Sequence, residues 1–176
     1  MSDGATALVV IDVQVAMFDP DDPVHGGEEL LATLGRLLAS AREAGSAVVF
    51  IQQDGRVGSA LAPGAPGHAI HGALSPWAGE SVVRKTMPDA FFATELDAVL
   101  HRRGVRRLVL CGIQTDLCVD TTCRRACSLG YDVTLVRDGH STWPRLGLSA
   151  EKIVAHHNDI LGDWFATAQD AADIRF

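Results

Sequence analysis

Cys118 is the residue whose position most clearly indicates chemistry. It follows an apolar run, Leu108–Cys111, and a short turn that begins at Gly112. The chain after it is typical of a helix, so the thiol is expected in the first helical turn. There the positive end of the helix dipole and the unpaired backbone N–H groups favour thiolate over thiol. The pattern therefore predicts a nucleophile, provided that the chain also supplies an acid–base partner.

Two further residues with useful chemistry stand at the ends of predicted strands. Asp12 lies at the end of Thr6–Val13, and Lys85 ends Val82–Lys85. Because ligands of an open parallel sheet bind beyond the carboxyl ends of its strands, these residues and Cys118 are expected to converge. A carboxylate can take up the thiol proton, and an ammonium beside both groups favours the thiolate. The turn before Cys118 can also aim backbone N–H groups at a developing oxyanion.

Each of these three residues also has an ordinary structural explanation. An aspartate after a strand is often a turn residue, a single lysine is usually solvated, and a single cysteine is often a small buried hydrophobe. The last description fits the other three cysteines of the chain. Spacing alone therefore leaves open whether Asp12, Lys85 and Cys118 form a site.

The elements that must position these residues alternate between strand and helix. The predicted strands are Thr6–Val13, Ala47–Ile51, Val82–Lys85, Arg107–Ile113, Asp132–Val136 and a short one in Trp164–Thr167. The predicted helices are Glu28–Ala44, Thr94–Arg103, Cys118–Leu129 and Ser149–Ile160. A Gly- and Pro-rich stretch, residues 54–79, is expected to form a long and functional loop. This order predicts one α/β domain over residues 1–176, a three-layer α/β/α, Rossmann-like fold with a mostly parallel sheet of about six strands and helices on both faces.

Composition argues against several classes of partner and location. The chain has 176 residues, 47% of them apolar, and a formal net charge of -7, which argues against nucleic acid or an anionic membrane as a partner. No apolar stretch approaches the roughly 20 residues of a membrane helix, and the N-terminus lacks the basic region of a signal peptide. Four cysteines without a zinc-type spacing or CxxC pair favour a reducing, cytoplasmic location. These are Cys111, Cys118, Cys123 and Cys127.

Short motifs in a fixed order carry a resemblance to a known family. They are Val10–Gln14, Lys85–Thr94 with Ala90-Phe91-Phe92 inside it, Gly112–Thr122, Asp138–Thr142 and Ala155–Asn158. With these motifs the chain resembles the isochorismatase-like cysteine hydrolases, the superfamily that includes nicotinamidases and N-carbamoylsarcosine amidase. The resemblance runs through almost the whole chain.

The resemblance implies specific roles. In such families the catalytic triad is an Asp, a Lys and a Cys at these motif positions, here Asp12, Lys85 and Cys118. A cis peptide is implied between Ile113 and Gln114, which would turn the N–H of Gln114, with that of Cys118, toward the oxyanion. The resemblance also implies a small-molecule substrate, no cofactor, and a homodimer or larger homo-oligomer.

One departure from the nicotinamidases concerns a divalent metal. Those enzymes carry Asp-x-His and a further His on the loop after the second strand, whereas this chain reads Gln52–Arg56 with no His at the matching position. His68 and His71 are the remaining candidates to join Asp54 at a metal, but loop histidines are more often solvated. We therefore expect no metal site and no nicotinamidase activity.

Two glutamines and several aromatic residues are candidates for binding the substrate. The glutamines follow strand ends and are suited to hydrogen-bond an amide, although backbone groups are equally good partners. Aromatic walls suit a small, partly apolar substrate, while core packing is the alternative for at least one member of the Phe91–Phe92 pair. The candidates are Gln14, Phe18, Gln53, Trp77 and Phe91.

The sequence thus predicts a metal-independent cysteine hydrolase that acts on a small amide or related C–N bond through a thioester. Vinyl-ether hydrolysis, as performed by true isochorismatases, is a close alternative, and some of those enzymes lack the cysteine. A non-catalytic binding protein on the same fold is a second alternative, against which the retention of all three triad residue types argues. A thiol redox sensor is the third, but helical spacing places Cys123 and Cys127 a turn or more from Cys118.

Overall fold

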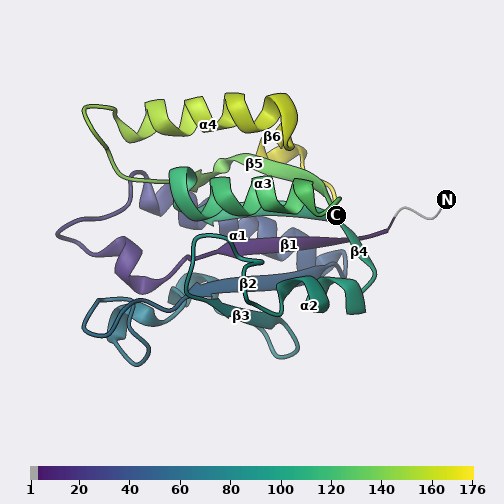
Figure 1. Cartoon of the computed structure of the whole chain (residues 1–176), viewed down its shortest axis with the longest axis horizontal. Helices are drawn as coiled ribbons and strands as arrows, with labels where there is room; N and C mark the ends of the chain where they lie inside the picture. The colour runs from purple at the N-terminus through teal and green to yellow at the C-terminus, as the bar shows by residue number, and fades with distance from the viewer. Residues whose placement is uncertain (1–3) are drawn as a thin grey trace.

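The computed structural model describes residues 4–176, in which a six-stranded parallel sheet lies between two layers of helices (Figure 1). The strand order is β3-β2-β1-β4-β5-β6. The strands are β1 (Ala5–Ile11), β2 (Ala47–Gln53), β3 (Ser81–Lys85), β4 (Val105–Ile113), β5 (Asp132–Ser141) and β6 (Thr167–Gln169). The helices are α1 (Gly27–Glu43), α2 (Leu96–Arg102), α3 (Asp120–Ser128) and α4 (Ala150–Trp164). The predicted three-layer α/β/α, Rossmann-like fold is confirmed.

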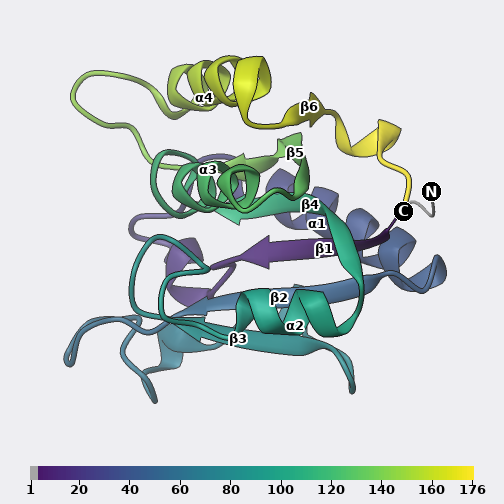
Figure 2. The same ribbon diagram turned by 45° about the vertical axis from the view of Figure 1, so that its right-hand side comes forward.

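Strand β1 explains why helices must cover both faces of the sheet. Successive side chains of a strand point to opposite faces, and from Thr6 onward every residue of β1 is buried. Leu8 and Val10 belong to a core cluster that includes the apolar stripe of α1. Ala7 and Val9 belong to a second cluster with buried residues of α2, α3 and α4. Figures 1 and 2 show α1 on the far face of the sheet from α2 and α3.

Several element boundaries differ from those predicted. The helix predicted from Cys118 is divided into a π-helical turn, Thr115–Val119, and α3, which begins at Asp120. Helix α4 continues past Ile160 to Trp164 because Leu161 packs in the core, so β6 (Thr167–Gln169) begins only at the last residue of the predicted strand Trp164–Thr167. Helix α2 begins at Leu96 instead of Thr94 and ends at Arg102, and β5 extends beyond Val136 to Ser141.

The connections between strands change direction next to β1. The chain runs outward from β1 to β2 and β3, and then returns to β4 on the other side of β1. In open α/β sheets ligands bind beyond the carboxyl ends of the strands at such a switch point. Asp12 directly follows β1, and the turn with Cys118 directly follows β4. The topology therefore brings these two residues to the same crevice.

Gly112 allows β4 to approach β1 closely just before this crevice. Its φ of 123° lies in a region that L side chains rarely adopt. A Cβ at this position would overlap the backbone oxygen of Ile11. Only glycine therefore fits at the point where β4 leads into the turn that carries Cys118.

Among residues 4–176, no helix combines the length and the apolar character required to cross a bilayer.

Candidate active site

Asp12, Lys85 and Cys118 meet at the carboxyl edge of the sheet. The Lys85 ammonium lies 2.7 Å from Oδ2 of Asp12 and donates a hydrogen bond to Sγ of Cys118 over 3.2 Å. Asp12 and Lys85 are almost completely buried, whereas Cys118 is partly exposed. The structure thus joins three residues that are far apart in the sequence into one linked group, with the thiol as the member open to solvent.

The backbone around Asp12 fixes the direction of its carboxylate. Asp12 has a φ of 50°, in the left-handed region that aspartate adopts more readily than most residues. Its N–H donates to the carbonyl of Ile51 in β2 over 3.0 Å, and its own carbonyl accepts from the N–H of Gln14. Asp12 is therefore held where β1 ends, beside the neighbouring strand β2.

Burial dominates the electrostatics of the group. It raises the pKa of Asp12, and the Lys85 ammonium opposes that rise. Burial and the nearby Asp12 carboxylate likewise raise the pKa of Cys118 to about 12, again opposed by Lys85. These effects oppose the thiolate that a helix N-terminus alone would favour, and Cys118 lies in a π-helical turn before α3 instead of in the helix itself.

Gln14 and Gln53, which are expected to bind substrate, form hydrogen bonds to other groups of the protein. The Gln14 side chain donates to the carbonyls of Gln53 and His68 and accepts from the N–H of Gln53, which satisfies most of its hydrogen-bonding capacity. Gln53 pairs with Lys85 in the sheet register, and its Oε1 accepts from the Lys85 ammonium over 2.7 Å. Gln53 therefore positions Lys85, and Gln14 fixes the loop that carries His68.

Of the three aromatic candidates, Trp77 lies away from this site, and Phe91 and Phe18 pack in or against the two core clusters. Trp77 precedes the amino end of β3, where Arg42 lies 4.1 Å from the centre of its ring, so it is at the opposite edge of the sheet from Lys85. Phe91 is buried in the core with its ring 5.8 Å from that of Tyr131. Phe18 packs on the other core cluster and on the ring of His71.

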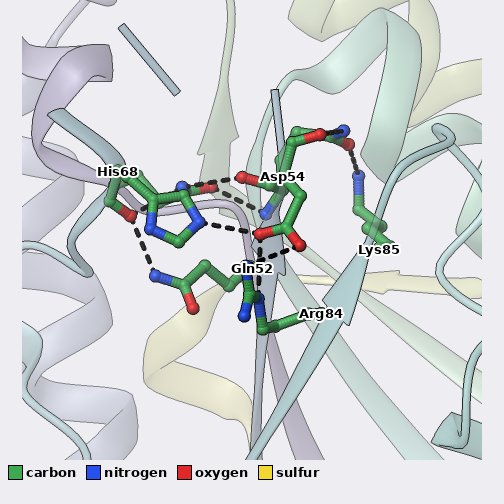
Figure 3. Close-up of polar contacts among 7 residues, drawn as sticks. Gln52, Asp54, His68, Arg84 and Lys85 are labelled. Atoms are coloured by element: carbon green, nitrogen blue, oxygen red, sulfur yellow. Dashed lines mark hydrogen bonds and ion pairs between the residues drawn. The ribbon is translucent and has the colours of Figure 1, made fainter. Parts of the chain in front are cut away.

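Two of the three candidate metal ligands, Asp54 and His68, form an ion-pair cluster with Arg84 (Figure 3). Both carboxylate oxygens of Asp54 contact Arg84, at 2.9 and 2.8 Å, and Oδ1 also lies 2.8 Å from Nε2 of His68. Although burial alone would raise it, the hydrogen bonds from Arg84 and His68 hold the pKa of Asp54 below its usual range. His71 faces elsewhere and accepts from the N–H of Ala73. The residues present do not fit a divalent metal, because the Arg84 guanidinium already neutralises the only carboxylate among the three candidates.

Comparison with known proteins shows which family the chain belongs to. The model of the isochorismatase domain matches residues 6–153. The chain belongs to the isochorismatase family of hydrolases. A crystal structure of an isochorismatase from Pseudomonas putida KT2440 superposes with a TM-score of 0.92 at 31% sequence identity, and the match covers 96% of this chain and 89% of that one.

Two curated relatives of this isochorismatase-family chain carry more specific names. A streptothricin hydrolase from Streptomyces noursei is 42% identical over 137 residues, which is 78% of this chain and 50% of the relative. A ureidoacrylate amidohydrolase from Variovorax paradoxus strain S110 is 28% identical, with 94% of this chain and 79% of the relative covered. The chain spans about half the length of the streptothricin hydrolases that it matches.

A cavity of about 540 Å³ lies beside the turn that precedes Cys118. Gln114 lines it, together with Met17, Leu61, Trp143 and Arg145 from the segments that follow β1, β2 and β5. Arg145 donates to Oε1 of Gln114 over 3.1 Å. The peptide bond between Ile113 and Gln114 is cis, as the family resemblance implied. Sequence reasoning missed Trp143 and Arg145, although both follow the carboxyl end of β5 and the strand-end rule points there.

Proposed function

We propose that the protein is a metal-independent cysteine hydrolase that cleaves a small amide or a related C–N bond through a thioester. The observation that carries the proposal is the contact of one ammonium, Lys85, with both the Asp12 carboxylate and the Cys118 sulfur. The names of an amidohydrolase and a hydrolase among the relatives support it. The presence of the cysteine favours amide over vinyl-ether hydrolysis.

In the first half of the proposed reaction, Sγ of Cys118 attacks the carbonyl carbon while Asp12 takes the thiol proton. Oδ1 of Asp12 has no hydrogen-bond partner among residues 4–176, so it offers a free acceptor. Lys85 stabilises the charge on the pair, and the backbone N–H groups of Gln114 and Cys118 bind the oxyanion.

In the second half, the tetrahedral intermediate collapses and its C–N bond breaks. Asp12 returns its proton to the leaving nitrogen, which departs as an amine or ammonia and leaves a thioester on Cys118. Asp12 then takes a proton from water, whose oxygen attacks the thioester carbon. The S–C bond breaks, the sulfur recovers the proton from Asp12, and the carboxylic acid leaves. The chain's own groups therefore complete the cycle.

Alkylation by iodoacetamide tests the proposal, with Cys127 as an internal control. Cys127 is also partly exposed but lies on α3, away from Asp12 and Lys85. We expect rapid, stoichiometric labelling of Cys118, lost in Cys118→Ala and slowed in Lys85→Ala, as read by peptide mass spectrometry. Equal, slow labelling of Cys118 and Cys127 would argue against an activated nucleophile and favour a non-catalytic protein.

The pH dependence of kcat/KM is expected to show an acidic limb set by Asp12. The carboxylate accepts the thiol proton, so activity is lost as the pH falls through the pKa of Asp12 and returns as it rises. Because burial raises that pKa above the ordinary value of 3.8, the loss begins at a higher pH than for an exposed aspartate. Assays from about pH 4 to about pH 9, with recovery checked at neutral pH, measure the limb. A profile that stays flat to the acid end would rule out Asp12 as the base.

Removal of divalent metals is expected to leave the activity unchanged. The Asp54 carboxylate is neutralised by Arg84 and also contacts His68. Among residues 4–176, no group of three or more His, Cys, Asp and Glu side chains is placed to hold a metal ion. Dialysis against EDTA, followed by assays with and without added Zn²⁺ or Mn²⁺, measures this. Activity that disappears with EDTA and returns with one metal would contradict the metal-independent mechanism.

We further infer that the chain is a single isochorismatase-like domain that works in the cytoplasm as a homodimer or larger homo-oligomer. Large apolar side chains exposed on the loop after β5 and at the end of α4, Leu146 and Trp164, support an assembly. Light scattering coupled to size-exclusion chromatography tests it, and a monomeric mass at micromolar concentration would count against it.

A further inference from the structure

We propose that Thr115 and His140 are positioning residues that hold the oxyanion side of the site in place. This inference rests on the proposed function, because it assumes that the N–H groups of Gln114 and Cys118 bind the oxyanion. Thr115 follows Gln114 and opens the π-helical turn that contains Cys118. His140 lies near the end of β5, beside β4 in the sheet. Among the described residues, neither Thr115 nor His140 forms a side-chain hydrogen bond or ion pair with Asp12 or Lys85, so any role in catalysis acts through the turn.

A chain of hydrogen bonds runs from the turn through the sheet to α4. Oγ1 of Thr115 lies 2.8 Å from Nδ1 of His140, and Nε2 of His140 lies 3.0 Å from Oδ1 of Asn158. The Asn158 amide nitrogen donates to the carbonyl of Arg137 over 3.0 Å. Thr115 is completely buried and His140 almost so. The turn is therefore tied to β5 and α4 by polar contacts inside the protein.

The hydrogen bond from Asn158 to Arg137 determines the direction of the other hydrogen bonds in this series. Because the Asn158 nitrogen faces the Arg137 carbonyl, its oxygen faces His140 and can only accept. Nε2 of His140 therefore carries the hydrogen. Burial lowers the pKa of His140 to about 4, so the ring is neutral near pH 7 and Nδ1 must accept. The Thr115 hydroxyl is thus the donor, and its rotamer is fixed.

The backbone hydrogen bonds of the turn connect the position of Thr115 to the oxyanion site. The carbonyl of Gln114 accepts the N–H groups of Leu117 and Val119, so the peptide unit that joins Gln114 to Thr115 anchors the whole turn. A side chain that held this unit only by filling space would not need a hydroxyl, since valine has almost the same shape. The hydroxyl adds a directional contact, and displacement of reacting groups by about 1 Å lowers rates on the order of 10²-fold.

Two reagents distinguish an effect on the reactivity of the Cys118 thiol from an effect on the oxyanion site. Iodoacetamide alkylates Cys118 by displacement of iodide, which develops no oxyanion. Butyraldehyde adds to the thiol: the S–C bond forms, the thiol proton passes to the carbonyl oxygen, and that oxygen then occupies the oxyanion position. The dissociation constant of butyraldehyde is measured by its protection of Cys118 from iodoacetamide. The variants are Thr115→Val, which removes the hydroxyl, and Thr115→Ser, which keeps it, with His157→Gln on α4 as the control.

We expect Thr115→Val to weaken butyraldehyde binding by about 10- to 100-fold while the iodoacetamide rate stays at the wild-type value. Thr115→Ser and His157→Gln should bind the aldehyde nearly as the wild type does. Wild-type aldehyde affinity in Thr115→Val would overturn the inference. An equal loss of both reactions, or a loss that Thr115→Ser does not restore, would also overturn it and assign Thr115 a merely structural role. If wild-type Cys118 is not alkylated, the proposed function itself fails, and the inference fails with it.

Discussion

Replacement of Cys118 by alanine is expected to lower kcat for amide hydrolysis by at least about 10³-fold. The variant keeps the Asp12–Lys85 ion pair and the turn, but it has no atom that can form the thioester. Attack by water would then have to replace a covalent step that the sulfur performs. Steady-state assays on small primary amides and ureido compounds, with purified variant at high concentration, measure the residual rate.

The matched control for this variant is Cys127→Ala. Cys127 is the other partly exposed cysteine among the described residues, and its removal should leave kcat and KM at wild-type values. Amide turnover that persists in Cys118→Ala would contradict nucleophilic catalysis by this residue. If the wild type hydrolyses vinyl ethers and no amide, the amide proposal is wrong and the ether alternative takes its place.

Breaking the buried ion pair is expected to have the second large effect. Asp12→Asn leaves the Lys85 ammonium buried with only Gln53 and the Cys118 sulfur as partners. Removal of one member of a buried ion pair destabilises a protein by about 3–5 kcal/mol, because the other charge stays uncompensated. Lys85→Met should reduce the free energy of unfolding less, since the remaining Asp12 can bind a proton and become neutral.

The double variant, Asp12→Asn with Lys85→Met, separates stability from catalysis. Replacement of a buried ion pair by uncharged groups is often nearly neutral for stability. We therefore expect the double variant to recover much of the stability that Asp12→Asn loses, as measured by urea unfolding, and yet to remain inactive. Activity in the double variant would mean that the pair is structural only. Wild-type stability in Asp12→Asn would mean that Lys85 is not buried as a charge.

The convergence of Asp12, Lys85 and Cys118 can be predicted from the sequence. Parallel strands end at one edge of a sheet, and each of these residues stands at or just after the end of a strand or its turn. Spacing could not decide between a site and three unrelated residues, and the motif resemblance was required for that. The alternation of strands and helices was likewise sufficient for the three-layer fold.

What the sequence did not predict depends on the contacts between elements. Gln53 contacts Lys85 because β2 and β3 pair in that register, which cannot be known from either strand alone. Trp77 was misplaced because an aromatic residue in a long loop gives no information about which edge of the sheet the loop reaches. The raised pKa of Cys118 follows from burial beside Asp12, and burial at this level is a property of the packed protein.

The most direct test of the central claim is the mass of the enzyme during turnover. Wild-type protein mixed with a hydrolysed amide and quenched in acid should gain the mass of the acyl group, and digestion should place that gain on the peptide with Cys118. Hydroxylamine, which cleaves thioesters, should remove it, and Cys118→Ala should never acquire it. Turnover with an acyl group on another residue, or turnover undiminished in Cys118→Ala, would contradict catalysis through a Cys118 thioester.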